Sequence, residues 1–132
     1  MTQKCTTIIR SRKETKNVGV KAHDICEVLL AIGIPPNLLG YTYITYATEL
    51  ILDNPKYMHA ITKKLYVEIA KKYDSTPARV ERDIRHAIKI GWLCGNMSFI
   101  SHIFRYCVNP EKSVPSNSLF LSRLYYYFQK SA

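Results

Sequence analysis

Residues 60–92 read AITKKLYVEIAKKYDSTPARVERDIRHAIKIGW, and this stretch decides the fold. Apolar residues recur at helical spacing on both sides of a short polar break at residues 74–76. Thr76 followed by Pro77 is a common helix start, because threonine caps free N–H groups and proline suits the first turn. The stretch therefore predicts two helices joined by a tight turn.

Helical spacing also extends through most of the remaining chain. Gly33, followed by two prolines, is expected to end the first helix, since glycine adopts a left-handed cap and proline blocks continuation. The segment 38–52 is rich in tyrosine and threonine, which leaves a strand open, although its alanine and leucine residues favour a helix. The predicted helices span residues 20–32, 38–52, 54–73, 76–94 and 97–106, with a last one opening at Ser116 or Asn117. We therefore expect an all-α fold of about six helices.

Length and composition exclude several classes of protein. A chain of 132 residues is long enough for one domain with its own core. Hydrophobic residues make up 47% and charged residues 22%, which is typical of a globular rather than a disordered chain. No apolar run reaches the ~18 residues of a membrane helix, and the basic N-terminus lacks the apolar segment of a secretory signal. We expect a cytoplasmic protein with no membrane partner.

The positive charge is concentrated in the middle of the chain. The formal net charge is +9, and residues 56–89 hold nine Lys and Arg against four Asp and Glu. Residues 21–55, in contrast, hold one Lys against four acidic residues. A charged helix face can be directed at a DNA groove, whereas a basic tail only attracts anions. The charge predicts an anionic partner, and a helix-turn-helix arrangement makes double-stranded DNA the candidate.

The second helix of this pair carries the candidate base-reading residues. Arg79, Arg82 and His86 share a face opposite the apolar stripe of the same helix. An arginine can donate two hydrogen bonds to guanine, and a carboxylate can accept one from cytosine. We therefore predict that Arg79, Glu81 and Arg82, in the first two turns of the helix, read bases.

Another group of side chains is predicted to bind the DNA backbone. Hydroxyl groups and cations near helix N-termini are suited to phosphate. The predicted backbone contacts are Thr62, Lys63, Ser75, Thr76, Arg85, His86 and Lys89. The same pattern also fits a solvated basic helix, in which Glu81 and Arg85 form an ordinary ion pair four residues apart. Both interpretations remain open at the level of the residues.

The cysteines and histidines form no recognisable catalytic or metal-binding motif. The four cysteines are irregularly spaced, so reduced and mostly buried thiols are expected rather than disulfides. A zinc site would need His23 with Cys26 and His102 with Cys107, spacings that do not make two convincing pairs. The sequence also lacks a nucleophile motif and a phosphate loop. We expect neither enzymatic activity nor a metal or cofactor.

Ten residues of the second helix, RVERDIRHAI at 79–88, resemble the recognition helix of a known family. The family is the C-terminal effector domain of stage 0 sporulation protein A, the sporulation response regulator of endospore-forming Firmicutes. The similarity covers roughly residues 20–128. It includes Ile32-Gly33-Ile34-Pro35, Gly40-Tyr41-Thr42-Tyr43, Ile61-Thr62-Lys63, Ile69-Ala70-Lys71-Lys72 and Pro115-Ser116-Asn117-Ser118-Leu119-Phe120.

This resemblance implies a fold, a target and partners. It implies a six-helix domain of the winged-helix-like DNA-binding superfamily, with a central helix-turn-helix and no wing. It implies binding to double-stranded DNA at TGTCGAA-like boxes, often as tandem head-to-tail copies, and control of transcription through RNA polymerase and its sigma factor. By the same resemblance, the positions of Arg79, Glu81 and Arg82 read bases, and those of Arg85 and His86 lie near the backbone.

The resemblance also defines domain boundaries and departures from the family. Residues 20–132 are expected to form the effector domain, with the helix-turn-helix at about 60–94. Residues 1–19 are expected to form a flexible basic arm, or one that follows a minor groove. The length leaves no room for the receiver domain of the family's full-length members, so control by phosphorylation is not expected. Asp83 stands where alanine is usual and adds a negative charge beside the reading face.

Two functional hypotheses follow from these observations. The first is a sequence-specific, DNA-binding regulator of transcription. The second is a protein-interaction module that keeps the fold but modulates RNA polymerase or a full-length paralogue without reading DNA specifically. Equal affinity for boxed and scrambled duplexes, alongside a tight protein complex, favours the second hypothesis.

Overall fold

The computed structural model describes residues 22–104 and 114–131, and within them the fold is all-α with no strand. The α-helices are α2 (Ala22–Ile32), α3 (Leu39–Asp53), α4 (Tyr66–Tyr73), α5 (Pro77–Cys94), α6 (Met97–Phe104) and α7 (Asn117–Ser131). A 3-10 helix, η2 (Pro55–His59), and a π-helix, η3 (Ile61–Leu65), lie between α3 and α4. The expected fold class is confirmed, and the tyrosine-rich segment 38–52 is helical, as its alanine and leucine content indicated.

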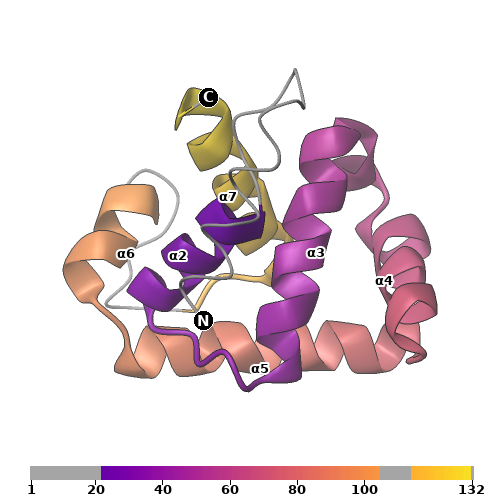
Figure 1. Cartoon of the computed structure of the whole chain (residues 1–132), viewed down its shortest axis with the longest axis horizontal. Helices are drawn as coiled ribbons and strands as arrows, with labels where there is room; N and C mark the ends of the chain where they lie inside the picture. The colour runs from indigo at the N-terminus through magenta and orange to yellow at the C-terminus, as the bar shows by residue number, and fades with distance from the viewer. Residues whose placement is uncertain (1–21, 105–113, 132) are drawn as a thin grey trace.

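Helix α5 is the longest helix of the described residues and runs along one edge of the molecule (Figure 1). Helices α3, α4 and α7 pack against it, and α2 packs on α3 and α6. In Figure 1, α4 lies beside the N-terminal end of α5, and α6 follows its other end. Among the described residues, no other helix lies on the opposite side of α5 in this view.

The predicted apolar stripe of α5 is confirmed as the centre of the core. Val80, Ile84 and Ile88 have no exposed surface. Trp92 continues the stripe and meets the rings of Phe104 and Phe120 edge-on, with ring centroids 5.1 and 6.1 Å apart. The rings of Phe104 in α6 and Phe120 in α7 also stack on each other, with their centroids 5.5 Å apart. The three rings therefore join α5 to α6 and α7.

Two glycines fix how the first helices meet α5. Gly33 ends α2 with a φ of 110°, as expected for a left-handed cap, and lets the buried Ile34 turn back to donate its N–H to the Leu29 carbonyl. Gly40 lies in the first turn of α3, where a Cβ would collide with the backbone carbonyl of Asp83. Helix α3 therefore approaches α5 at this point more closely than any larger residue allows.

The predicted helix 54–73 is not continuous, which corrects one expectation. Asn54 does cap a helical turn, since its side chain accepts the Lys56 N–H at 3.2 Å. The chain then breaks at Ala60, whose φ and ψ are −146° and 48°, before η3 and α4 begin. The turn η2 buries none of its residues, whereas Leu65 in η3 and Ile69 in α4 are fully buried. A straight helix of this length would extend about 30 Å, so the break redirects the chain and lets its second half reach the core.

The thiols also differ from the prediction. Cys94, at the end of α5, is exposed, and Cys26 is half-buried, so neither of the two described thiols is fully buried. Cys5 and Cys107, like the basic arm 1–19, lie outside the described residues. Within residues 22–104 and 114–131, no three or more His, Cys, Asp or Glu side chains are grouped closely enough to bind a metal ion.

Candidate nucleic-acid interface

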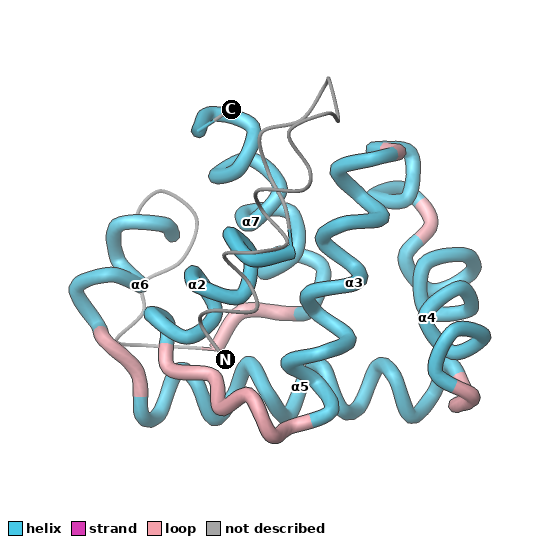
Figure 2. Tube along the Cα trace, viewed as in Figure 1, coloured by secondary structure: helices cyan, strands magenta, loops and turns pink. Residues whose placement is uncertain are grey.

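The turn between α4 and α5 has the short form that the sequence predicted (Figure 2). Asp74 adopts the left-handed conformation, with φ 54° and ψ 52°, and is the only described residue other than glycine with a positive φ. Aspartate tolerates this conformation better than most residues, although it still costs about 1 kcal/mol. Ser75 donates its N–H to the Ala70 carbonyl at 2.9 Å, and Thr76 Oγ1 accepts the Arg79 N–H at 3.2 Å. The two helices are therefore joined by three residues, as in a helix-turn-helix.

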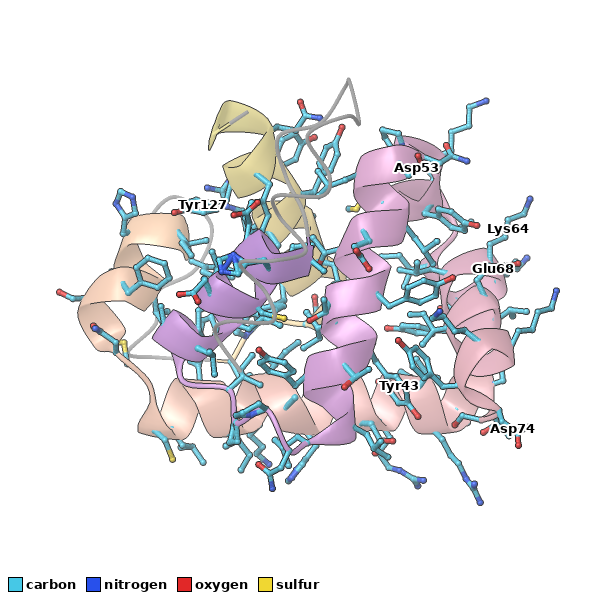
Figure 3. The ribbon with its side chains drawn as sticks, viewed as in Figure 1. Tyr43, Asp53, Lys64, Glu68, Asp74 and Tyr127 are labelled. Atoms are coloured by element: carbon cyan, nitrogen blue, oxygen red, sulfur yellow. The ribbon has the colours of Figure 1, made fainter. Side chains whose placement is uncertain are left out.

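Helix α5 separates its apolar and basic residues onto opposite faces. Arg79, Arg82, Arg85, His86 and Lys89 are exposed, and the apolar stripe of the same helix is buried. Figure 3 shows nitrogen-tipped side chains projecting from α5 on the side away from α2, α3 and α7. An α-helix is about 10–12 Å in diameter with its side chains, so α5 can lie in a DNA major groove about 12 Å wide.

The candidate base reader Glu81 is paired with Arg85. Arg85 Nε and Nη2 donate to the two carboxylate oxygens of Glu81, each at 3.0 Å. These hydrogen bonds lower the pKa of Glu81 below its ordinary value of 4.5, against the opposing effect of partial burial, and the nearby charge of Arg82 lowers it further. Glu81 is thus a carboxylate at neutral pH. Each of its oxygens has a second lone pair, so the pair still leaves an acceptor for a cytosine amino group.

The N-terminal end of α5 offers two further candidate contacts. Thr76 is exposed, and its hydroxyl, which accepts from the backbone, keeps its own proton for donation to a phosphate. Ser75 is half-buried beside it. The first N–H groups of a helix also favour an anion, which makes this end of α5 suited to the DNA backbone.

Thr62 and Lys63 lie apart from α5, in the first turn of η3. Both are exposed and line an open hollow of about 450 Å³. The other lining residues are Met58, His59, Ala60, Ile61, Tyr66 and Ser118. Ser118 comes from the start of α7, so the structure places the beginning of α7 next to the predicted phosphate contacts. No periodicity or motif in the sequence points to this neighbour.

Not every cation of the basic mid-chain block belongs to the exposed face of α5. Lys72 Nζ lies 5.0 Å from the ring centroid of Tyr46 and 5.7 Å from that of Tyr73. It therefore makes cation–π contacts where α3 meets α4. Lys71, also on α4, lies 3.8 Å from the Glu68 carboxylate. Only part of the excess positive charge in residues 56–89 therefore lies on the exposed face of α5.

Of the two candidate caps of α7, Ser116 and Asn117, only Ser116 caps the helix. Ser116 Oγ accepts the Leu119 N–H at 3.1 Å and is the cap. Asn117 is buried instead, and its amide nitrogen donates to the Tyr66 hydroxyl at 3.0 Å and to the Glu81 carbonyl at 3.1 Å. A residue far along the chain therefore touches both helices of the helix-turn-helix, which sequence reasoning did not detect.

Comparison with known protein families agrees with this geometry. The family model described as "Sporulation initiation factor Spo0A C terminal" matches residues 25–128. The chain belongs to this family. The Spo0A C-terminal family consists of DNA-binding effector domains that regulate transcription in sporulation, and it is not a family of enzymes. The resemblance carried by residues 79–88 is thereby confirmed.

The family match covers the whole of the helix-turn-helix and most of the helices around it. The six α-helices of residues 22–104 and 114–131 and the three-residue turn before α5 agree with the fold that the resemblance implied. A search of the described residues for a helix long and apolar enough to cross a membrane found none. The basic face of α5 is accordingly the candidate DNA-binding surface of a Spo0A C-terminal domain.

Proposed function

We propose that this member of the Spo0A C-terminal family is a sequence-specific transcription regulator that binds TGTCGAA-like boxes in double-stranded DNA, with α5 in the major groove. The observation that carries the proposal is the single exposed face of α5. Five basic or titratable side chains of that face stand opposite a fully buried apolar stripe, so the face is free to meet DNA while the core holds the helix. The family match and the three-residue turn before α5 support the same orientation.

The proposed base readers are Arg79, Glu81 and Arg82, all in the first two turns of α5. The arginines are suited to guanine O6 and N7, since a guanidinium donates two parallel hydrogen bonds. Glu81 is suited to a cytosine amino group, because its carboxylate stays ionised and keeps free lone pairs beside Arg85. Two guanine readers and one cytosine reader match a TGTCGAA-like box, which contains these bases on its two strands.

The proposed backbone contacts surround these readers. They are Thr62, Lys63, Ser75, Thr76, Arg85, His86 and Lys89. Cations and hydroxyl groups bind phosphates without regard to base identity, so these residues set affinity and register. We expect the affinity to fall steeply with salt, because each neutralised phosphate releases counterions.

The proposal extends to the domain organisation and partners of the chain. Residues 20–132 form the effector domain, and the basic segment 1–19 is an arm that adds attraction to DNA. On DNA, two copies bind tandem boxes head to tail, and the bound protein contacts the sigma factor of RNA polymerase. These events take place in the cytoplasm, at the nucleoid.

The decisive test is the substitution Arg82→Ala. Its affinity for a duplex with a TGTCGAA box is expected to fall by about 1–3 kcal/mol, because a bidentate base contact is lost. Its affinity for a scrambled duplex should fall only by the effect of one missing charge. Fluorescence anisotropy titrations of both duplexes at one salt concentration measure the two affinities.

Lys71→Ala is the matched control, since Lys71 is an exposed cation on α4 beside Glu68. It removes the same charge without removing a proposed base reader. We expect this variant to lose affinity equally for the box duplex and for the scrambled duplex. If Arg82→Ala also leaves the ratio of the two affinities unchanged, the base-reading assignment is wrong. If the wild-type chain itself binds both duplexes equally, the protein is better described as an interaction module with a retained fold.

A further inference from the structure

Asn117 is buried against the helix-turn-helix although it belongs to the first turn of α7. Its amide nitrogen donates one hydrogen bond to the Tyr66 hydroxyl in α4 and one to the Glu81 backbone carbonyl in α5. A carbonyl oxygen can only accept, so the amide must direct its NH2 group, and not its oxygen, at Glu81. Both N–H groups of the side chain are thus used, one on each helix of the pair.

These two bonds hold α5 at the turn that carries the proposed base readers. The Glu81 carbonyl lies within the same helical turn as Arg79 and Arg82. Because the backbone of a helix is rigid, a bond at this carbonyl limits how α5 can rotate or slide relative to α7. The contact of Gly40 with the Asp83 carbonyl limits the same turn from α3. The reading turn is therefore held by two helices outside the helix-turn-helix.

The bond to Tyr66 ties α4 to the same amide. The Tyr66 side chain is 5% exposed, and burial raises the pKa of its hydroxyl while the bond from Asn117 lowers it. The hydroxyl is therefore neutral at neutral pH, and its oxygen accepts the Asn117 N–H. One side chain of α7 thus bonds to both α4 and α5, 51 residues from its partner in α4 and 36 residues from its partner in α5.

We propose that Asn117 is a positioning residue that determines sequence discrimination by fixing α4 and α5 relative to the start of α7. This inference rests on the proposed base-reading function of α5. Attraction between cations and phosphates changes little over a small displacement, whereas a bidentate hydrogen bond to a base requires close placement of the donor. Loss of Asn117 therefore weakens binding to the box more than binding to a scrambled duplex.

The test is the affinity of Asn117→Ala for a TGTCGAA duplex and for a scrambled duplex, with folding checked by circular dichroism. We expect the preference for the box to fall about tenfold, the effect of one poorly matched base pair. The affinity for the scrambled duplex and its salt dependence should stay at wild-type values, since no phosphate contact is removed. A loss that affects both duplexes alike overturns the inference, because reduced stability alone produces it.

Ser116→Ala is the matched control. It removes the cap bond to the Leu119 N–H and weakens the same end of α7, but leaves both acceptors of Asn117 in place. We expect it to keep the wild-type preference, and an equal loss of preference in this variant overturns the inference. If Asn117→Ala does not fold, Tyr66→Phe replaces it, because this variant removes one of the two bonds. The preference should then fall severalfold, and an unchanged preference overturns the inference.

A measurement without DNA separates this inference from the proposed function. In a ¹H–¹⁵N spectrum of the free protein, the backbone signals of residues 79–82 should shift in Asn117→Ala and stay unchanged in Ser116→Ala. If the wild-type chain shows no preference for the box, the proposed function fails, and these signals alone decide whether Asn117 positions α5. Unshifted signals overturn the positioning role whatever the chain binds.

Discussion

Residues 54–73 and 76–94 open in the same way, with a capping side chain followed by proline, but they fold differently. Asn54 caps a 3-10 turn that is followed by a break, a π-helix and the short α4. Thr76 caps α5, which runs unbroken for 18 residues. The capping side chains make comparable bonds, each 3.2 Å long to a backbone N–H. A capping signal therefore predicts where a helix begins, and does not predict how far it continues.

The difference lies in what each segment can bury. The stripe of α5 contacts the core over its whole length, from Val80 to Trp92. The turn η2 buries none of its residues, and full burial begins only at Leu65. Most of the stability of a helix in a protein comes from packing its apolar face, so a segment whose apolar residues are only partly buried gains less from continuing straight. The break at Ala60 lies between η2, whose Tyr57 and Met58 are only partly buried, and the fully buried Leu65.

The largest expected effect compares the same substitution in both segments. Ile84→Ala in α5 should lower the free energy of unfolding by about 2–5 kcal/mol, because Ile84 is fully buried and leaves a cavity. Ile61→Ala in η3 should lower it by less than half of that, since Ile61 is only partly buried. Urea denaturation of both variants measures the difference. Equal losses would show that the broken segment contributes as much to the core as α5.

A smaller effect is expected from the two caps. Thr76→Ala should lower the free energy of unfolding by about 1 kcal/mol, because it frees an N–H at the start of a long, packed helix. Asn54→Ala should lower it by about 0.5 kcal/mol, because the turn that it caps is short and contains no buried residue. Thermal denaturation without DNA compares them. A larger loss in Asn54→Ala would mean that η2 supports the start of α4 more than its burial indicates.

The smallest effect concerns the ion pairs of the two segments and depends on pH. The pKa of Glu81 is lowered by Arg85, so this pair stabilises the folded protein above the ordinary pKa of 4.5, and the stabilisation is lost as the pH falls through the lower folded value. Glu81→Gln should therefore be slightly less stable than wild type at pH 7, and the difference should disappear on acidification. Urea midpoints of both proteins, measured from pH 7 downward, give the comparison.

Glu68→Gln is the control for this pH dependence. Glu68 makes a single 3.8 Å contact with Lys71 in α4, in place of the two 3.0 Å bonds of the pair in α5. Its substitution should change the stability at pH 7 by less, since exposed pairs without bidentate geometry contribute little. If Glu81→Gln and Glu68→Gln behave alike, the bidentate geometry has no measurable consequence for folding.

Much of the fold was predictable because the relevant signals are local. The start of α5 at Thr76-Pro77, its end at Gly95 and its buried stripe follow from capping and from the 3.6-residue period. The left-handed cap at Gly33 follows from the conformational freedom of glycine. The break at Ala60 was not predictable, because the Asn54-Pro55 start and the apolar spacing of residues 54–73 favour one helix and no local pattern marks the interruption.

In the candidate site, too, the features set by local sequence were predictable and those set by packing between distant helices were not. The residues on the exposed face of α5 were predictable, because opposite faces of one helix are separated by periodicity alone. The pairing of Glu81 with Arg85 was also predictable from their spacing of four residues. The hollow that joins Thr62 and Lys63 to Ser118 was not, because it depends on where α7 lies relative to η3.

The sequence by itself thus determined an all-α protein, two helices joined by a short turn at residues 74–76, and a basic helix whose apolar side faces the core. All of these arise from interactions within a few residues of one another. Only the tertiary structure decided where the chain breaks before α4 and which residue fixes the two helices of the pair. Asn117 meets Tyr66 and Glu81 across 51 and 36 residues, and such a contact exists only once the intervening helices have packed.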